Sequence, residues 1–308
     1  MSDDDVGIAP SGEQIEISFD SQRAIVVEVG GGLRSYAVAG RDVLDGFAVD
    51  EQPASGRGQV LVPWPNRLQD GSYTFDGRSH QLPLTEPEHA NAIHGLVRWA
   101  AWRIGEREAH RVVMEHVIHP QPGYPFTLGL GIEYALSEKG LAVTTIARNL
   151  GSDACPYGCG HHPYLTGGTP TVDTLELQAP GRRVLVSDER DLPAGSEPVD
   201  GTEYDFRAAR TIGATKLDNA FTDLDRDDDG RARVALRDPD GGAAVTLWVD
   251  ESYGYLMLFT GDTRPDVNRR SLAVEPMTCP PNAFRTGDSL VRLEPGQSTT
   301  SAWGIAPS

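Results

Sequence analysis

The sequence predicts an all-β fold, a large antiparallel sandwich of many short strands. Apolar residues recur with a period of two in several segments, and turn-forming residues separate these segments. No segment of ten or more residues combines helical periodicity with caps, which argues against a helix-rich fold. The 34 Gly and 22 Pro are spread along the 308 residues, a distribution typical of short strands joined by loops.

The alternation is clearest in residues 126–136, where apolar side chains occupy every second position. Successive side chains of a strand point to opposite faces, so this pattern predicts a half-buried strand. Further segments with this period lie at residues 15–19, 113–117, 141–147, 233–237, 245–249 and 255–259. Turn residues between them, at 76–77, 138–140 and 238–242, predict hairpin connections.

The domain organisation is predicted to be simple. No repeat period and no long Pro- or Ser-rich linker interrupts the chain, so we expect a single domain over residues 13–308. Residues 1–12 are polar, and we expect them to be a frayed terminal segment.

Composition and charge limit the classes of partner. Hydrophobic residues make up 39% and charged residues 23%, as in globular proteins with a sizeable core. A net charge of −18 disfavours nucleic acid and anionic membranes as partners, because phosphate groups recruit Lys and Arg. No apolar run approaches the ~20 residues of a membrane helix. The acidic N-terminus is unlike a signal peptide, and three cysteines do not indicate a disulfide framework. We therefore expect a cytoplasmic protein with a small-molecule partner, either monomer or homodimer.

Residues 155–165 raise the question of a metal, because Cys155 and Cys159 precede His161 and His162. A structural zinc site takes ligand pairs from two segments, and the remaining cysteine, Cys279, has no ligand partner beside it. Packing of the cysteines in the core is the favoured interpretation, and no metal is expected here.

The acidic segment 225–230 imitates the start of a calcium-binding EF-hand loop. The twelfth position of such a loop should be a bidentate Glu, but it is Leu236 here. We expect a solvated acidic turn between strands rather than a calcium site.

Three residues have neighbours that suggest proton chemistry. His94 lies in Ala-Ile-His-Gly-Leu, and His162 precedes a proline, which restricts its backbone to extended conformations. Glu275 lies in a mostly uncharged, proline-rich stretch, where burial would raise its pKa into the range useful to a general base. Taken singly, each histidine is more often a surface or satisfied core residue, whereas Glu275 is equally compatible with a structural role.

Two further segments have the composition of a carbohydrate site. Residues 63–67, Pro-Trp-Pro-Asn-Arg, combine a rigid aromatic stretch with Arg67, and Asp218 stands among apolar residues in Leu-Asp-Asn-Ala-Phe. In carbohydrate sites, aromatic rings pack on sugar faces and forked polar side chains bind sugar hydroxyls. Many loops at the border of a core contain the same residue types.

In their order along the chain, these motifs resemble those of the aldose 1-epimerase (galactose mutarotase-like) family. The series comprises Pro65-Asn66-Arg67, His94-Gly95, His162-Pro163-Tyr164, the segment 217–221, and Glu275-Pro276-Met277 with Pro281-Asn282-Ala283. Each motif is short, but five in order over residues 57–284 make the resemblance fairly specific.

The resemblance implies a large antiparallel β-supersandwich and sugar mutarotation without a metal, nucleotide or redox cofactor. It implies Glu275 as general base and His162 as general acid, meeting in one pocket although they lie 113 positions apart. It also implies sugar-binding residues. Those are Arg67, His94 and Asp218, with Asn66, Arg98 and Tyr164 as further candidates.

One departure from the family pattern leaves the substrate open. Many galactose mutarotases carry a longer Gly-rich segment after the first His-Gly, whereas residues 93–98 form a compact run before Trp99. This run is similar to that of divergent branches, some of which act on hexose 6-phosphates, and Arg98 is suited to pair with a phosphate. A hexose-6-phosphate 1-epimerase and a non-catalytic carbohydrate-binding or sensing protein are therefore the alternatives.

Overall fold

The computed structural model describes residues 8–241 and 244–307. Regular structure is almost entirely β, and the strand pairs of the two largest sheets are antiparallel, which confirms the predicted fold class. Every segment predicted as a strand lies in one, except that residues 126–127 precede theirs. The α-helical part of the described chain is one four-residue turn, α1 (Ala283–Thr286).

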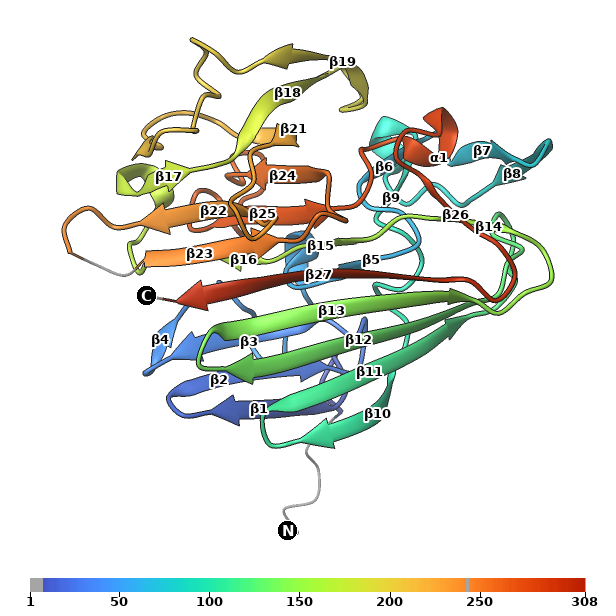
Figure 1. The fold of residues 1–308 in the computed structure, drawn as a ribbon, viewed down its shortest axis with the longest axis horizontal. Helices are drawn as coiled ribbons and strands as arrows, with labels where there is room; N and C mark the ends of the chain where they lie inside the picture. Colours follow the sequence, from blue (N-terminus) through green and yellow to red (C-terminus); the bar gives the residue numbers. More distant parts are fainter. Residues whose placement is uncertain (1–7, 242–243, 308) are drawn as a thin grey trace.

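Two layers of sheet build the molecule (Figure 1). The first layer is a nine-stranded sheet whose strands are, in spatial order, β10 (Arg103–Glu108), β11 (Arg111–Ile118), β12 (Leu128–Ser137), β13 (Gly140–Asn149), β27 (Ser298–Pro307), β23 (Ala244–Val249), β22 (Ala232–Arg237), β17 (Glu176–Gln178) and β20 (Arg210–Thr211).

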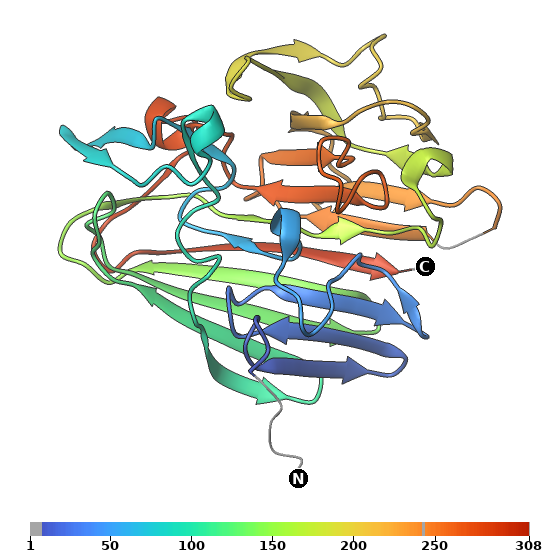
Figure 2. The same ribbon diagram turned by 180° about the vertical axis from the view of Figure 1, so that it is seen from behind.

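The second layer contains an eight-stranded and a four-stranded sheet. The eight-stranded sheet runs β19 (Pro193–Pro198), β18 (Gly181–Ser187), β21 (Asp218–Leu224), β24 (Tyr255–Phe259), β25 (Leu272–Met277), β15 (Gly160–His161) and β5 (Val60–Leu61), with β16 (Tyr164–Leu165) also paired to β25. The four-stranded sheet is β1 (Gln14–Phe19), β2 (Gln22–Val27), β3 (Leu33–Val38) and β4 (Arg41–Asp42), and it covers β11 and β12 (Figure 2).

Three small ladders complete the described strands. They are β6 (Arg67–Gln69) with β9 (Asn91–Ile93), β7 (Ser72–Phe75) with β8 (Arg78–Gln81), and β14 (Cys155–Tyr157) with β26 (Val291–Leu293). The turn between β7 and β8 consists of Asp76 and Gly77, both with positive φ (48° and 73°). Two-residue hairpin turns of this kind need positive φ, which Asp-Gly adopts readily.

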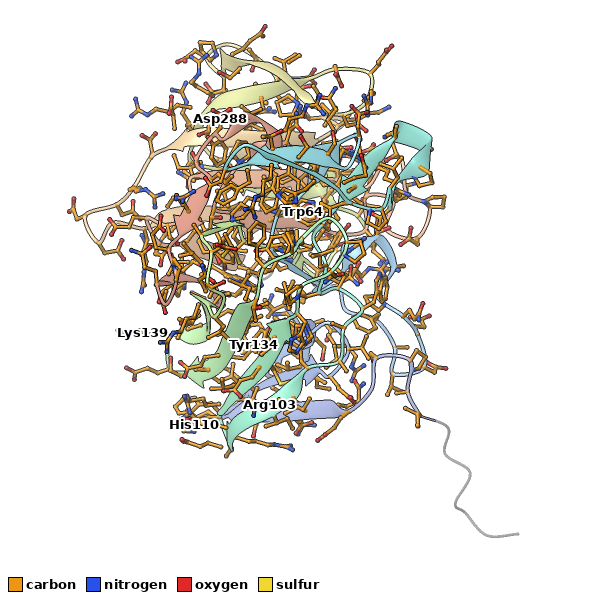
Figure 3. The ribbon with its side chains drawn as sticks, turned by 90° about the vertical axis from the view of Figure 1, so that its right-hand side faces the viewer. Trp64, Arg103, His110, Tyr134, Lys139 and Asp288 are labelled. Atoms are coloured by element: carbon orange, nitrogen blue, oxygen red, sulfur yellow. The ribbon has the colours of Figure 1, made fainter. Side chains whose placement is uncertain are left out.

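The core lies between the layers. Along β12, buried and half-buried residues alternate over nine positions, so one face of this strand packs inward, as the period-two pattern predicts. Figure 3 shows Trp64 among crowded side chains and Lys139 at the periphery. One cluster of buried apolar residues extends in sequence from Ile15 to Ile305.

The central strand β25 is buried at all six positions, and it carries Glu275 into this interior. Of the segment expected to be frayed, residues 1–7 lie outside the described residues, and Ser11 is buried within a turn. Among the described helices, none has the length and apolar character that crossing a membrane requires.

Candidate active site

A cavity of about 630 Å³ is lined by Glu275 of β25 and by most of the other residues singled out in the sequence. Its lining comes from several separate parts of the chain. It includes Arg67, His94, His162, Asp218, Glu275, Asn66 and Arg98, whereas Tyr164 lies outside the lining. A larger cavity of about 1060 Å³ is lined by Ala54 and Arg57, next to Ser55 and Gly56 of the smaller one, but by none of the predicted site residues, so we take the smaller cavity as the site.

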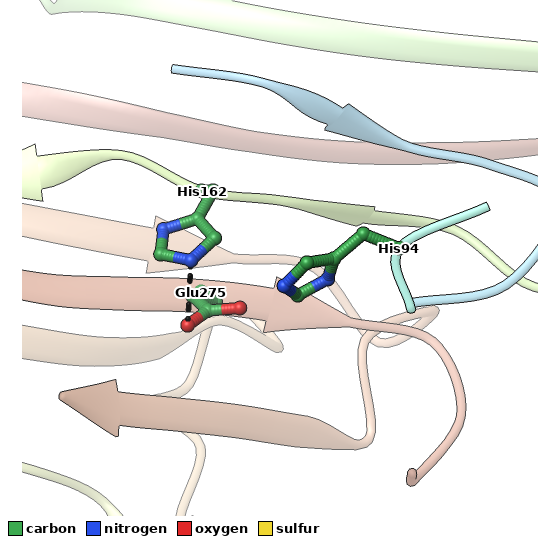
Figure 4. Close-up of side chains that lie close together, drawn as sticks. All are labelled: His94, His162 and Glu275. Carbon is green, nitrogen blue, oxygen red and sulfur yellow. Dashed lines mark ion pairs between the residues drawn. The ribbon is translucent and has the colours of Figure 1, made fainter. Parts of the chain in front are cut away.

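His162 and Glu275 contact each other within this cavity (Figure 4). Nε2 of His162 lies 3.3 Å from Oε1 of Glu275, and their side chains are only 6% and 3% exposed. The strand register explains the meeting, because β15 and β16 both pair with β25, Gly160 opposite Met277 and Tyr164 opposite Ala273. His162 lies midway between Gly160 and Tyr164, and Glu275 lies midway between Ala273 and Met277, so the two residues face each other.

A turn behind His162 holds its imidazole. The ring stacks on Tyr164 with centroids 5.0 Å apart and planes inclined by 10°, and the Tyr164 hydroxyl donates to the carbonyl of Ser55 at 2.8 Å. Gly56 also approaches the ring with φ +77°, and a Cβ there would lie 2.6 Å from Cδ2 of His162. Only glycine meets both the conformation and the close approach.

His94 is held by the backbone of Asn66. The N–H of Asn66 donates to Nδ1 of His94 at 3.2 Å, and the carbonyl of Asn66 accepts from the N–H of His94 at 2.9 Å. Burial, followed by the charge of Arg98, lowers the pKa of His94 well below its usual value, so the ring is neutral. With Nδ1 accepting, the proton of the neutral ring resides on Nε2, which makes His94 a hydrogen-bond donor.

Arg67 lies on β6 opposite Ile93, the residue before His94. Its guanidinium forms two parallel bonds with Glu86, Nε to Oε2 at 2.8 Å and Nη2 to Oε1 at 2.9 Å, and Nη2 lies 3.2 Å from Asp191. Such a bidentate pair fixes the guanidinium plane. Neither acidic partner has a sequence signal, since Glu86 and Asp191 each lie among other acidic residues and no local pattern links them to Arg67.

Asp218 begins β21, where it pairs with Phe259 of β24. Burial raises the pKa of its carboxyl to about 6, although the nearby Arg67 lowers it. The side chain is open to solvent within the cavity, yet the protein around the cavity limits the water that can stabilise a carboxylate. Asp218 therefore changes charge close to neutral pH.

Burial acts in opposite directions on the two contacting groups. It raises the pKa of Glu275 well above its ordinary value, and Asp218 adds to this effect. It also lowers the pKa of His162 to about 3, with a further contribution from Arg98. Both pKa shifts favour the uncharged forms, a carboxylic acid beside a neutral imidazole. Transfer of the acid proton to the imidazole gives a carboxylate beside an imidazolium, and the pair holds the same number of protons and a total charge of zero in both forms.

The cluster His94, His162 and Glu275 brings three potential metal-ligand atoms within 4.8 Å of one another. Two histidines and a glutamate are a ligand set that zinc accepts. In His94, however, Nδ1 accepts the Asn66 N–H and Nε2 carries the proton, so neither nitrogen has a free lone pair. The arrangement suits hydrogen bonding to a ligand better than coordination of an ion.

The cysteines of the motif that raised the metal question lie in the core. Cys155 and Cys159 are free and buried, and Sγ of Cys159 lies 3.8 Å from Nε2 of His161. His161 points away from the cavity, donating to or accepting from Thr145 at 3.0 Å. Adjacent histidines on a strand face opposite sides, which separates His161 from His162.

Comparison with known proteins agrees with this geometry. The family model described as aldose 1-epimerase matches residues 13–305. The chain belongs to the aldose 1-epimerase family. This membership makes the chain an isomerase of the mutarotase type and confirms the resemblance inferred from the five motifs.

Several relatives and structures are similar over most of the chain. The uncharacterized protein YihR of Escherichia coli is 35% identical over 93% of this chain and 91% of its own. A maltose epimerase of Levilactobacillus brevis is 28% identical, covering 72% and 71%, respectively. In fold, the chain is similar to a GalM/aldose epimerase homologue from C. elegans, with a TM-score of 0.85, 18% identity and coverage of 96% and 98%.

Proposed function

We propose that this member of the family interconverts the α and β anomers of a hexose, with Glu275 as general base and His162 as general acid. The single observation that carries the proposal is the 3.3 Å contact between the two groups inside the cavity. The anomeric hydroxyl and the ring oxygen of a pyranose are bonded to the same carbon. Two adjacent groups are therefore suited to address both oxygens from one side of the sugar.

The reaction requires the charged form of the pair, which proton transfer from Glu275 to His162 across their contact supplies. The Glu275 carboxylate takes the proton of the anomeric hydroxyl while the His162 imidazolium protonates the ring oxygen. The bond between C1 and the ring oxygen breaks, giving an open-chain aldehyde. After rotation about C1–C2, the hydroxyl adds to the other face of the aldehyde and both protons return.

The other lining residues are proposed to hold the sugar. Nε2–H of His94 donates to a sugar oxygen, the Asp218 carboxylate accepts from a hydroxyl, and Arg67 donates from the part of its guanidinium that Glu86 does not occupy. Buried Oε2 of Glu275 has no hydrogen-bond partner among the described residues, as expected of an atom that a ligand hydroxyl satisfies. We assign Tyr164 a positioning role behind His162 and Asn66 the same role behind His94.

The experiment is NMR measurement of anomer exchange with a panel of hexoses and hexose 6-phosphates. The proposal predicts faster exchange of at least one sugar than in buffer alone. A carbohydrate-binding or sensing protein would bind a sugar and leave its exchange rate at the uncatalysed value, which would contradict the proposal.

A cytoplasmic location and a sugar rather than a nucleic acid as partner are part of the same proposal. The support is that Cys155, Cys159 and Cys279 are all free and buried, as in proteins of reducing compartments. The net charge of −18 adds repulsion toward phosphate backbones.

A further inference from the structure

Two arginines line the site cavity and form no salt bridge with a carboxylate among the described residues, although Glu86 acts on Arg98, and Asp218 interacts with Arg264, at longer range. Arg98 is partly buried, and its side-chain hydrogen bonds to other described residues are long, 3.5 Å to Oε1 of Gln59 and 3.4 Å to the carbonyl of Ile93. Arg264 lies on the loop after β24, and its side chain makes no hydrogen bond or ion pair within the described part of the chain. For the partly buried Arg98 this is unusual, because charges removed from water are normally paired, whereas the exposed Arg264 keeps its guanidinium free at the cavity.

The third arginine of the cavity shows the contrast. Arg67 is held by Glu86 and Asp191, so its charge is balanced within the protein. Carboxylates are abundant in a chain with 45 acidic and 27 basic residues, so a shortage of partners does not explain the state of Arg98 and Arg264. Their charges are available to a ligand in the cavity.

Both arginines act on the residues proposed to hold and protonate the sugar. Their charges each contribute to the lowered pKa of His94, and that of Arg98 also contributes to the lowered pKa of His162. An anionic group bound between the two arginines would thus lie in the same cavity as the reacting sugar atoms. Such a group is most simply a substituent of the sugar itself.

We infer that the substrate is an aldose carrying a singly charged oxyanion substituent, such as a carboxylate or a sulfonate, which Arg98 and Arg264 bind. Guanidinium groups pair bidentately with such oxyanions. One negative charge fits better than two, because Glu88 and Asp218 line the same cavity and would repel a dianion. This inference rests on the proposed function and names the substrate class of its site.

The test compares kcat/KM for anomer exchange of four sugars. Glucose is neutral, glucuronate and 6-deoxy-6-sulfoglucose carry one negative charge, and glucose 6-phosphate carries two. The wild type is expected to prefer a singly charged sugar over both glucose and glucose 6-phosphate. Arg98→Gln and Arg264→Gln should each lower kcat/KM for that sugar by about 10- to 100-fold, the typical cost of a lost hydrogen bond to a charged group. The value for glucose should fall by much less.

The matched control is Arg103→Gln. Arg103 lies on the edge strand β10, outside the cavity lining, and its side chain is 75% exposed beside Glu115. The substitution changes the net charge equally and should leave the ratio between charged and neutral sugar unaltered. Since Arg264 is exposed, Arg264→Gln remains informative if Arg98→Gln lowers the melting temperature strongly.

The inference is overturned if the wild type exchanges glucose at least as efficiently as the singly charged sugars, or if both glutamine variants impair all sugars equally. A preference for glucose 6-phosphate would contradict the inference that the substituent carries a single negative charge.

If no sugar is turned over, the proposed function fails, and binding is then measured by quenching of Trp99, which is 52% exposed at the cavity. Binding of glucuronate that exceeds that of glucose and falls in Arg264→Gln supports the inference even then. Equal binding of the two sugars contradicts it.

Discussion

His162 and Glu275 occupy opposed positions on neighbouring antiparallel segments, since Gly160 pairs with Met277 and Tyr164 pairs with Ala273. The backbone N–H of Val274 donates to the carbonyl of Pro163 in the same register. Opposed residues on one face of a sheet have side chains in contact range. The strand pairing therefore fixes the separation of the proposed acid and base more firmly than loops would.

Asp218 should make sugar binding depend on pH. Burial raises the pKa of this carboxyl to about 6, so it is ionised above that pH and protonated below it. Because protonation removes an acceptor for a sugar hydroxyl, KM should rise as the pH falls through 6. Asp218→Asn should raise KM at pH 7.5 and abolish this dependence. A KM for wild type that stays constant between pH 5 and pH 7.5 would exclude Asp218 from binding.

The same shift predicts an effect on stability. An acid whose pKa is higher in the folded than in the unfolded state binds more protons when folded, so its contribution to stability is lost as the pH rises between the ordinary value near 4 and about 6. Asp218→Asn is therefore expected to raise the melting temperature at pH 7 and to have little effect at pH 4. Thermal unfolding of both proteins at the two pH values checks this, and a lower melting temperature at pH 7 would contradict it.

Gly56→Ala should impair turnover through His162. The added Cβ would lie 2.6 Å from the imidazole, and the positive φ of +77° adds strain of about 1–2 kcal/mol. Gly296→Ala is the matched control, since Gly296 has φ +78° and no atom within 4 Å of the added Cβ. Both variants should lose stability, but only Gly56→Ala should lower kcat. Equal kcat in the two variants would mean that the turn does not position the ring.

Tyr164→Phe tests the positioning role of the hydroxyl behind His162. The change removes the 2.8 Å bond to Ser55 and retains the stacked ring, so stability should fall by about 1 kcal/mol. We expect kcat to fall several-fold, with KM little changed. Tyr73→Phe removes a comparable 2.8 Å bond, to the carbonyl of Gly123, away from the cavity, and should cost stability alone. A similar kcat for both variants would assign Tyr164 a purely structural role.

The strands could be predicted from the alternation of apolar residues alone, whereas the pocket residues could be predicted only through the family resemblance. Alternation sufficed for strands such as β12, because one face of each packs on the core. The convergence of Arg67, His94, His162, Asp218 and Glu275 followed from the family motifs, and the cavity contains all five. Glu86 and Arg264 escaped prediction because their proximity arises from sheet topology, which leaves no local pattern. The direct contact between His162 and Glu275 likewise depends on register, which no single segment encodes.

The direct test of the proposed acid–base pair is anomer exchange by Glu275→Gln and His162→Asn, measured by NMR against wild type on a sugar that wild type turns over. Each substitution removes one proton-transfer group while retaining a polar side chain. We predict that each lowers kcat by about 10²–10⁴-fold, whereas sugar affinity falls much less, because His94, Arg67 and Asp218 retain their contacts. Turnover of Glu275→Gln at a rate near that of wild type would place the base elsewhere and contradict the account.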